Sequence, residues 1–191
     1  MQAVRFWIAS HPKAVYDMAI DAHFLKTLIH DEVTTLSDAR VVNQVKKLLV
    51  EPRVVLRSWD YGEPGQQYPC WIILDDPAHP YSAIAFCEYG FGPTMPWGLV
   101  SSGDAVSDMS MGMDSEWFFT FLDAYFNSWA ATQLPIWKIL KEEPGGALIP
   151  LSEEGEWNST WDRIKELRNS DPSGRYHCRH AVTYGDGSQS D

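Results

Sequence analysis

The chain concentrates groups suited to binding in the segments 88–93 and 96–98. Two glycines and two prolines bend this part of the chain, so Tyr89, Phe91 and Trp97 are expected to project from a rigid loop beside the Glu88 carboxylate. Aromatic rings bury a large area at small entropic cost and dominate the energetics of protein interfaces. We predict that these four residues form a contact surface. The alternative is that the rings pack against the aromatic segment 117–129 as core.

Three carboxylates follow in a loop of small and polar residues, at Asp104, Asp108 and Asp114. Several oxygen ligands in one loop are typical of calcium sites, but this run lacks the alternating carboxylates and the closing bidentate glutamate of the twelve-residue calcium loop. We therefore predict no metal here. The three acids are instead expected to form a negative rim around the contact loop, which favours a basic partner.

The cysteines and histidines show no spacing typical of a catalytic or metal site. Cys70, Cys87 and Cys178 are an odd set without a pairing pattern, which indicates reduced thiols in a cytosol. The run 177–180 holds two histidines around Cys178, but no fourth ligand for zinc stands at recognisable spacing. Gly90 and Gly92 lack the further residues of a nucleotide-binding loop. We predict no cofactor and no metal.

Charge is distributed unevenly along the chain, whose net charge is −11. Residues 58–137 contain ten carboxylates, no lysine or arginine, and 17 of the 25 aromatic residues. Such a surface attracts a cationic partner over a Debye length of about 10 Å and offers it flat rings to cover. Nucleic acid and anionic lipid both require a basic footprint, so we predict neither as a partner.

Length and composition indicate one globular domain over residues 1–185, followed by a disordered tail over 186–191. The chain has 191 residues and 45% hydrophobic content, enough to bury a substantial core. No signal peptide is recognisable at the start, and the apolar runs are shorter than the 18 or more residues of a membrane-spanning helix. These features predict a cytoplasmic protein.

The periodicity of apolar residues predicts helices first and strands next. Helices are expected over residues 10–29 and 36–49, with Pro52 ending the second. From residue 53 apolar residues alternate in β-branched and aromatic runs, which favours strands at 53–59, 70–74, 81–89 and 97–100. Because only short turns separate these runs, we expect an antiparallel meander.

The last third of the chain predicts two more helices. A helix over 114–131 carries apolar residues most of the way round, so it is expected either to lie in the core or to meet a partner, a homodimer face among the alternatives. A strand at 136–140 and a helix at 157–167 follow, and residues 170–185 are expected to be an ordered extension or tail. We predict a single α+β domain: an N-terminal helical pair, an antiparallel β-meander, a central aromatic-rich helix and a C-terminal helix.

These observations together predict a small acidic binding or inhibitory protein that occludes a basic partner such as a toxin or nuclease domain. In general character the chain is similar to bacterial toxin-immunity proteins, although no motif places it in one of their families. Steering charge and contact rings are the two features that such a protein needs. We favour this hypothesis over catalysis.

Two alternatives remain open at this stage. The first is a hydrolase-like enzyme in which Asp75, Asp76 or Glu88 serves as general acid or base, because a desolvated carboxyl with a raised pKa can do such work. The second is a module that stacks sugars or a peptide on Trp59, Trp71 or Trp97. A row of exposed rings would support the second alternative, and burial of all three would oppose it.

Overall fold

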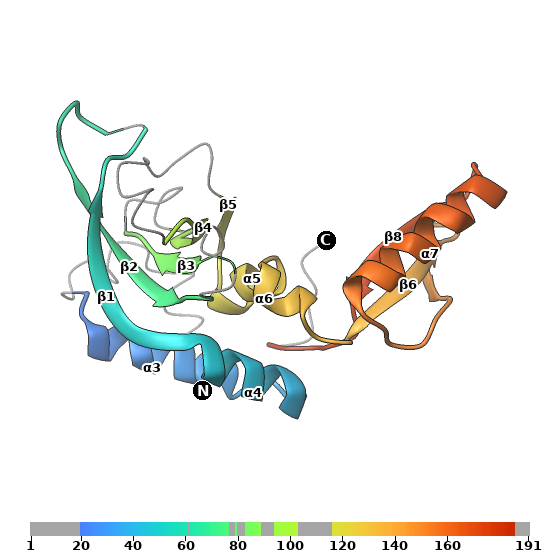
Figure 1. The fold of residues 1–191 in the computed structure, drawn as a ribbon, viewed down its shortest axis with the longest axis horizontal. Coiled ribbons are helices and arrows are strands. Elements are labelled where there is room, and N and C mark those ends of the chain that lie inside the picture. The colour runs from blue at the N-terminus through green and yellow to red at the C-terminus, as the bar shows by residue number, and fades with distance from the viewer. Residues whose placement is uncertain are drawn as a thin grey trace.

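The computed structural model describes residues 20–60, 62–76, 79, 83–88, 94–102 and 116–185. It has an α+β architecture with two antiparallel sheets (Figure 1). Helices α3 and α4 run along one side of a five-stranded sheet, and α5 and α6 lie between this sheet and a second, three-stranded sheet that carries α7. The predicted tail 186–191 lies outside the described residues.

The N-terminal helical pair is confirmed, with different starting points. Helix α3, Ala22–Val33, begins after Asp21, whose carboxylate accepts a hydrogen bond from the Phe24 backbone N–H. Within the described residues the helix expected from residue 10 begins only at Ala22, and residues 10–19 lie outside the described part. Helix α4, Ala39–Leu48, begins after Asp38, which caps it in the same way. Both caps satisfy N–H groups that a helix start leaves without intrahelical partners.

The predicted meander is confirmed as a sheet of order β1-β2-β3-β4-β5. Its strands are β1 Leu49–Arg57, β2 Tyr68–Leu74, β3 Ala83–Phe86, β4 Trp97–Val100 and β5 Glu116–Phe118. Strand β1 follows α4 directly and contains Pro52, next to an irregularity in its pairing with β2. An edge strand tolerates a proline there because the residue need not donate to the ladder.

The predicted central aromatic-rich helix is present as α5, but its predicted bounds, residues 114–131, are wrong. Residues 116–118 form β5, and two short helices follow: α5, Phe121–Phe126, and α6, Trp129–Thr132. The Thr120 side chain accepts a hydrogen bond from the Asp123 N–H and so starts α5 only there. A run of aromatic residues suits a half-buried strand as well as a helix, and pairing with β4 decides for the strand.

A second sheet of order β7-β6-β8 includes part of the stretch after residue 170, which was expected to be an ordered extension or tail. It consists of β6 Trp137–Glu142, β7 Leu148–Pro150 and β8 Arg175–His180, and α7, Trp157–Ser170, covers one face. The predicted strand at 136–140 and helix at 157–167 are confirmed by β6 and α7. Figure 1 shows this unit extending away from the five-stranded sheet.

The main core lies between the five-stranded sheet and the helices α3 to α6. It contains Leu25 and Val45 from the helices, Ile84 from β3, and Phe121 and Tyr125 from α5, none of which is exposed. A smaller core joins Ile139 and Tyr176 of the second sheet to Ile164 of α7. In the part of the chain that the structure describes, no helix has the length and apolarity needed to cross a bilayer.

Candidate functional site: an aromatic groove between the two sheets

A groove of about 580 Å³ lies between the five-stranded sheet and the three-stranded sheet. Aromatic rings from both sides line it, and its acidic or basic members are Asp123, Arg179 and His180. We call it the aromatic groove. Its rings include Trp117, Phe119, Phe126, Trp129, Trp157 and Tyr184.

The wall on the side of the large sheet begins at the edge strand β5. Trp117 stands opposite Gly98 of β4, and its ring lies 2.7 Å from where a Cβ of residue 98 would be. Only glycine leaves room for the ring in this position. Phe119 and Trp129 follow in the groove and are the most exposed rings of the described residues, at 59% and 54%.

The Trp129 ring stacks on His79, which is itself fixed by polar contacts. The His79 ring stacks on it at 5.6 Å with an angle of 6° between the planes. His79 Nδ1 lies 3.0 Å from the Asp76 carboxylate, which also accepts a hydrogen bond from Gln133 and is only 5% exposed. This chain of contacts orients a ring that is 54% exposed.

The wall on the side of the small sheet comes from the end of β8 and the segment after it. Phe126 of α5 stacks on His180 at 4.1 Å and on Tyr184 at 4.8 Å between ring centroids. The Tyr184 hydroxyl donates a hydrogen bond of 2.8 Å to Asp123. Asp123 therefore serves to fix a ring, and its charge is already engaged.

Neither His180 nor Cys178 is prepared for nucleophilic chemistry in the groove. His180 Nδ1 lies 2.9 Å from the Val182 carbonyl, and burial of the ring lowers the pKa of His180, so the imidazole is neutral. Burial raises the pKa of the Cys178 thiol to about 11. A neutral thiol is a poor nucleophile, so the groove is suited to stacking and hydrogen bonding.

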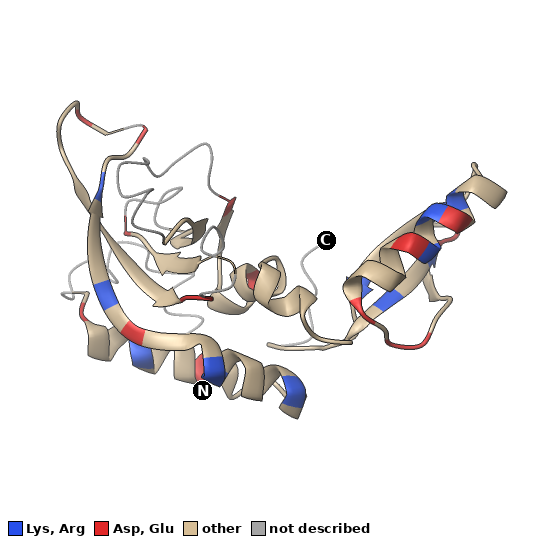
Figure 2. Cartoon of the chain, in the orientation of Figure 1, with Lys and Arg blue, Asp and Glu red and all other residues tan. Residues whose placement is uncertain are grey.

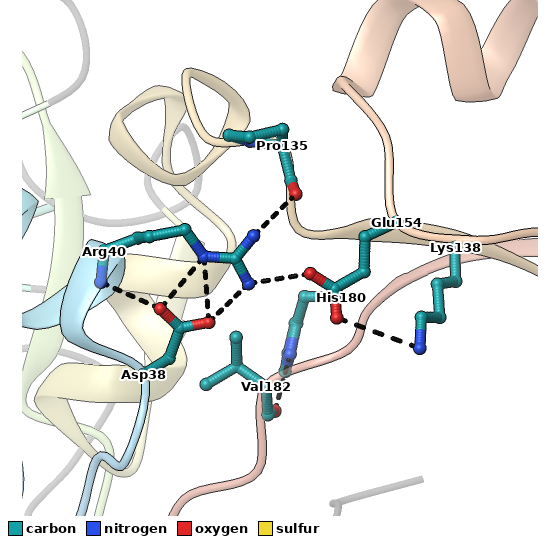
Figure 3. Close-up of polar contacts among 7 residues, drawn as sticks. All are labelled: Asp38, Arg40, Pro135, Lys138, Glu154, His180 and Val182. Carbon is teal, nitrogen blue, oxygen red and sulfur yellow. Dashed lines mark hydrogen bonds and ion pairs between the residues drawn. The ribbon is translucent and has the colours of Figure 1, made fainter.

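The two sheets are joined beside the groove by a cluster of charged residues around Arg40 (Figure 3). Arg40 pairs with Asp38 at 2.6 Å in its own helix and with Glu154 at 2.7 Å in the connection between β7 and α7. It also donates to the Pro135 carbonyl at 3.2 Å, and Lys138 approaches Glu154 at 3.8 Å. This cluster links α4 to the small sheet.

The pH dependence of stability tests this link. The hydrogen bond from Arg40 lowers the pKa of Asp38 below its ordinary 3.8. A depressed folded pKa gives stability that is present above pH 3.8 and is lost as the pH falls through the folded pKa. We expect Arg40→Gln to lower the unfolding free energy at pH 7 and to lose this difference towards pH 3, measured by urea denaturation.

Arg163→Gln is the matched control, because Arg163 pairs with Glu166 within α7 and joins no two elements. It is expected to leave stability unchanged at both pH values. A wild-type advantage over Arg40→Gln that is the same at pH 7 and near pH 3 would contradict the assignment.

Of the residues predicted as a contact surface, Trp97 lies in the core. It is 1% exposed and packs edge-on against Phe86 at 5.2 Å and Phe121 at 5.4 Å. This corresponds to the alternative in which the rings pack against the aromatic segment. Glu88 is half-buried just after β3. The other predicted members, Tyr89, Phe91, Asp104, Asp108 and Asp114, lie outside the described residues, and their role stays a prediction.

The acidic segment 58–137 does not form one negative surface among its described residues (Figure 2). Asp60 and Glu63 are exposed in the connection between β1 and β2, and neither lines the groove. Asp75 pairs with Arg53 of β1 at 3.2 Å, and Asp76 is buried. At Asp75, folding thus places beside an acid of this segment a cation that the segment itself lacks, because Arg53 belongs to the neighbouring strand β1.

The structure also places the residues of the two alternative functions, the carboxylates of a hydrolase-like enzyme and the tryptophans of a stacking module. Asp75, Asp76 and Glu88 are not part of the aromatic groove. Trp59 and Trp71 are half-buried, so they form no row of exposed rings with the buried Trp97.

Cys70 and Cys87 face each other across β2 and the end of β3, with their sulfurs 3.3 Å apart and both residues fully buried. Among the described residues no cluster of three metal-ligating side chains occurs.

Sequence reasoning assigned no site role to Arg179, His180 and Tyr184, because it interpreted residues 170–185 as an ordered extension or tail. The run 177–180 attracted attention only as a possible zinc site. A signal was present, since Tyr176, Cys178 and His180 alternate with polar residues as in a half-buried strand.

Comparison of the chain with protein-family models, curated proteins and solved structures gives no match.

Proposed function

We propose that this chain is a protein-binding module that occludes part of a partner protein and seats it in the aromatic groove. The observation that carries the proposal is the pair of exposed rings, Phe119 and Trp129, at the side of a groove lined by further fixed rings. Oriented aromatic side chains are typical anchors of protein interfaces because they lose little entropy on binding.

The proposed partner is a basic protein, and the proposed role is inhibition of the immunity type. The net charge of −11 supports this choice, because charge of opposite sign raises the rate of encounter even where it is spread over the surface. In this proposal the overall charge acts at long range and the rings of the groove act at contact.

Capture of partners from the source cell by the immobilised chain tests the proposal through Trp129→Ala. We expect this variant to lose the captured proteins, since removal of an interface anchor typically weakens binding by 2 kcal/mol or more, about thirtyfold. Capture by the wild type should fall between about 0.1 and about 1 M salt, as the Debye length shortens from about 10 to about 3 Å.

Val54→Ala is the matched control, because Val54 is a comparably exposed apolar residue, at 45%, on strand β1 and outside the groove. It should capture the same proteins as the wild type. If Trp129→Ala captures them equally well, the groove is not the contact surface; if salt has no effect, the partner is not selected by charge.

A further inference from the structure

The aromatic groove is bordered by the outer edge of strand β8, which is unpaired among the described residues. In the order β7-β6-β8 this strand is outermost, and no further strand pairs with it among the described residues. Cys178, Arg179 and His180 of β8 all line the groove. An edge strand presents main-chain N–H and C=O groups that can pair with another chain.

The hydrogen bonds of the sheet show which residues of β8 face the edge. Ala181 donates its N–H to the Ile136 carbonyl at 2.8 Å. In antiparallel pairs the residues alternate in direction, so Arg179 also faces β6, and Cys178 and His180 direct their backbone groups outward.

The partner strand β6 agrees with this assignment. Trp137 and Ile139, which stand opposite His180 and Cys178, direct their backbone groups to the far side of β6. Trp137 exchanges hydrogen bonds with Gly155, and the Ile139 carbonyl accepts from Leu151. The N–H and C=O groups of Cys178 and His180 consequently have no hydrogen-bond partner in the part of the chain that the structure describes.

The side chain of Arg179 supplies a second, independent feature. It stands directly opposite Lys138 of β6, on the face of the small sheet that α7 does not cover. Like charges in directly opposed positions destabilise a sheet. Lys138 reaches Glu154 at 3.8 Å, whereas the Arg179 guanidinium makes no ion pair or hydrogen bond with any described residue. A carboxylate beside Arg179 would offset this repulsion.

We propose that β8 is the docking edge for an extended segment of the partner protein, which adds to the small sheet as a fourth strand. Its main chain pairs with Cys178 and His180. Its side chains at those positions are apolar and enter the aromatic groove, and the residue beside Arg179 is acidic. The inference rests on the proposed function and names the chemistry of the segment that the groove takes.

This local preference for an acid is compatible with a basic partner. Net charge acts on encounter over the Debye length, whereas one carboxylate beside Arg179 sets the register of the added strand after contact. Addition of a strand gains affinity mainly from main-chain hydrogen bonds, and alternate side chains provide specificity.

Titration of the full chain with short blocked peptides tests the proposal, followed through backbone amide signals in the NMR spectrum. The probe alternates valine with polar residues and has a central glutamate; a matched probe has a central lysine. We expect the glutamate probe to shift the Cys178 and His180 amides and to bind about twofold to fivefold more tightly than the lysine probe. Arg179→Glu should reverse this order.

Arg163→Glu is the control for the charge reversal, because Arg163 lies on the exposed side of α7. It should keep the preference of the wild type. A probe N-methylated at the amides that pair with β8 should not bind, since it cannot donate. Binding of that probe, no binding of any probe, or an order of affinity indifferent to Arg179→Glu would each overturn the proposal.

The failure of this inference is distinguishable from the failure of the proposed function. If Trp129→Ala abolishes partner capture and Arg179→Glu leaves it unchanged, the groove binds the partner without a strand at β8. If Trp129→Ala leaves capture unchanged, the proposed function itself is wrong.

Discussion

Replacement of Trp97 by alanine is expected to lower the free energy of unfolding by about 3–5 kcal/mol. The side chain is 1% exposed and lies edge-on against Phe86 and Phe121, at the junction of β4 with α5. Its loss removes the transfer energy of a large ring and leaves a cavity that the surrounding strands cannot close. Urea denaturation followed by circular dichroism measures the change.

Trp129→Ala is the matched control, since it removes the same ring from a position that is 54% exposed. It should change stability by less than about 1 kcal/mol, because more than half of the residue is already exposed to water in the folded chain. Equal losses in the two variants would contradict the burial described here. If Trp97→Ala does not fold, Trp97→Phe keeps most of the contact and should show a smaller loss that can be measured.

Replacement of Glu32 by alanine is expected to cost about 1–3 kcal/mol. Glu32 is 8% exposed in α3, and its carboxylate accepts a hydrogen bond of 3.0 Å from the Leu122 backbone N–H. Leu122 lies in the first turn of α5, where N–H groups lack intrahelical partners and negative charge is favourable. The carboxylate thus connects two helices that are 90 residues apart in the chain.

Two further variants distinguish loss of the hydrogen bond between Glu32 and Leu122 from a general loss of stability in α3. Asp31→Ala removes a neighbouring acid that is exposed, and it should change stability by less than about 0.5 kcal/mol. Glu32→Gln retains an acceptor oxygen and should lose less than Glu32→Ala. If all three variants unfold at the same urea concentration as the wild type, the contact does not contribute to stability.

The elements that the sequence predicted well are those that local chemistry determines. Helix α4 follows from its apolar stripe at Val41, Val45 and Leu48, and strands β2 and β4 follow from short apolar runs between turn residues. Their short connections predicted the antiparallel order, because parallel strands need longer crossovers. These properties depend only on neighbours along the chain.

The aromatic segment 116–132 was predicted incorrectly because its local signals conflict. Acidic residues at its start and rings on all sides suit a helix, but pairing with β4 takes Glu116–Phe118 into the sheet. Thr120 then caps a separate short helix. Strand pairing is a long-range interaction, and the pattern of one segment does not reveal it.

The choice of residues that form the candidate site depended on tertiary contacts even more than the secondary structure did. Sequence reasoning chose Trp97 as a contact ring, and its neighbours Phe86 and Phe121 enclose it. It placed Tyr184 in an ordered extension or tail without naming its contacts, which are a hydrogen bond to Asp123 and stacking on Phe126. A ring has the same sequence signature whether it is covered or exposed, so only the packing of the elements distinguishes an anchor from a core residue.

By itself, the amino-acid sequence determined the α+β class, the antiparallel meander and an acidic, ring-rich composition, because these follow from periodicity, turn residues and charge. The tertiary structure alone decided where the acids and rings lie: Asp75 beside Arg53, Trp97 inside, and Trp129 in a groove that ends at β8. Burial and pairing arise from contacts between residues far apart in the chain, and composition is insensitive to them.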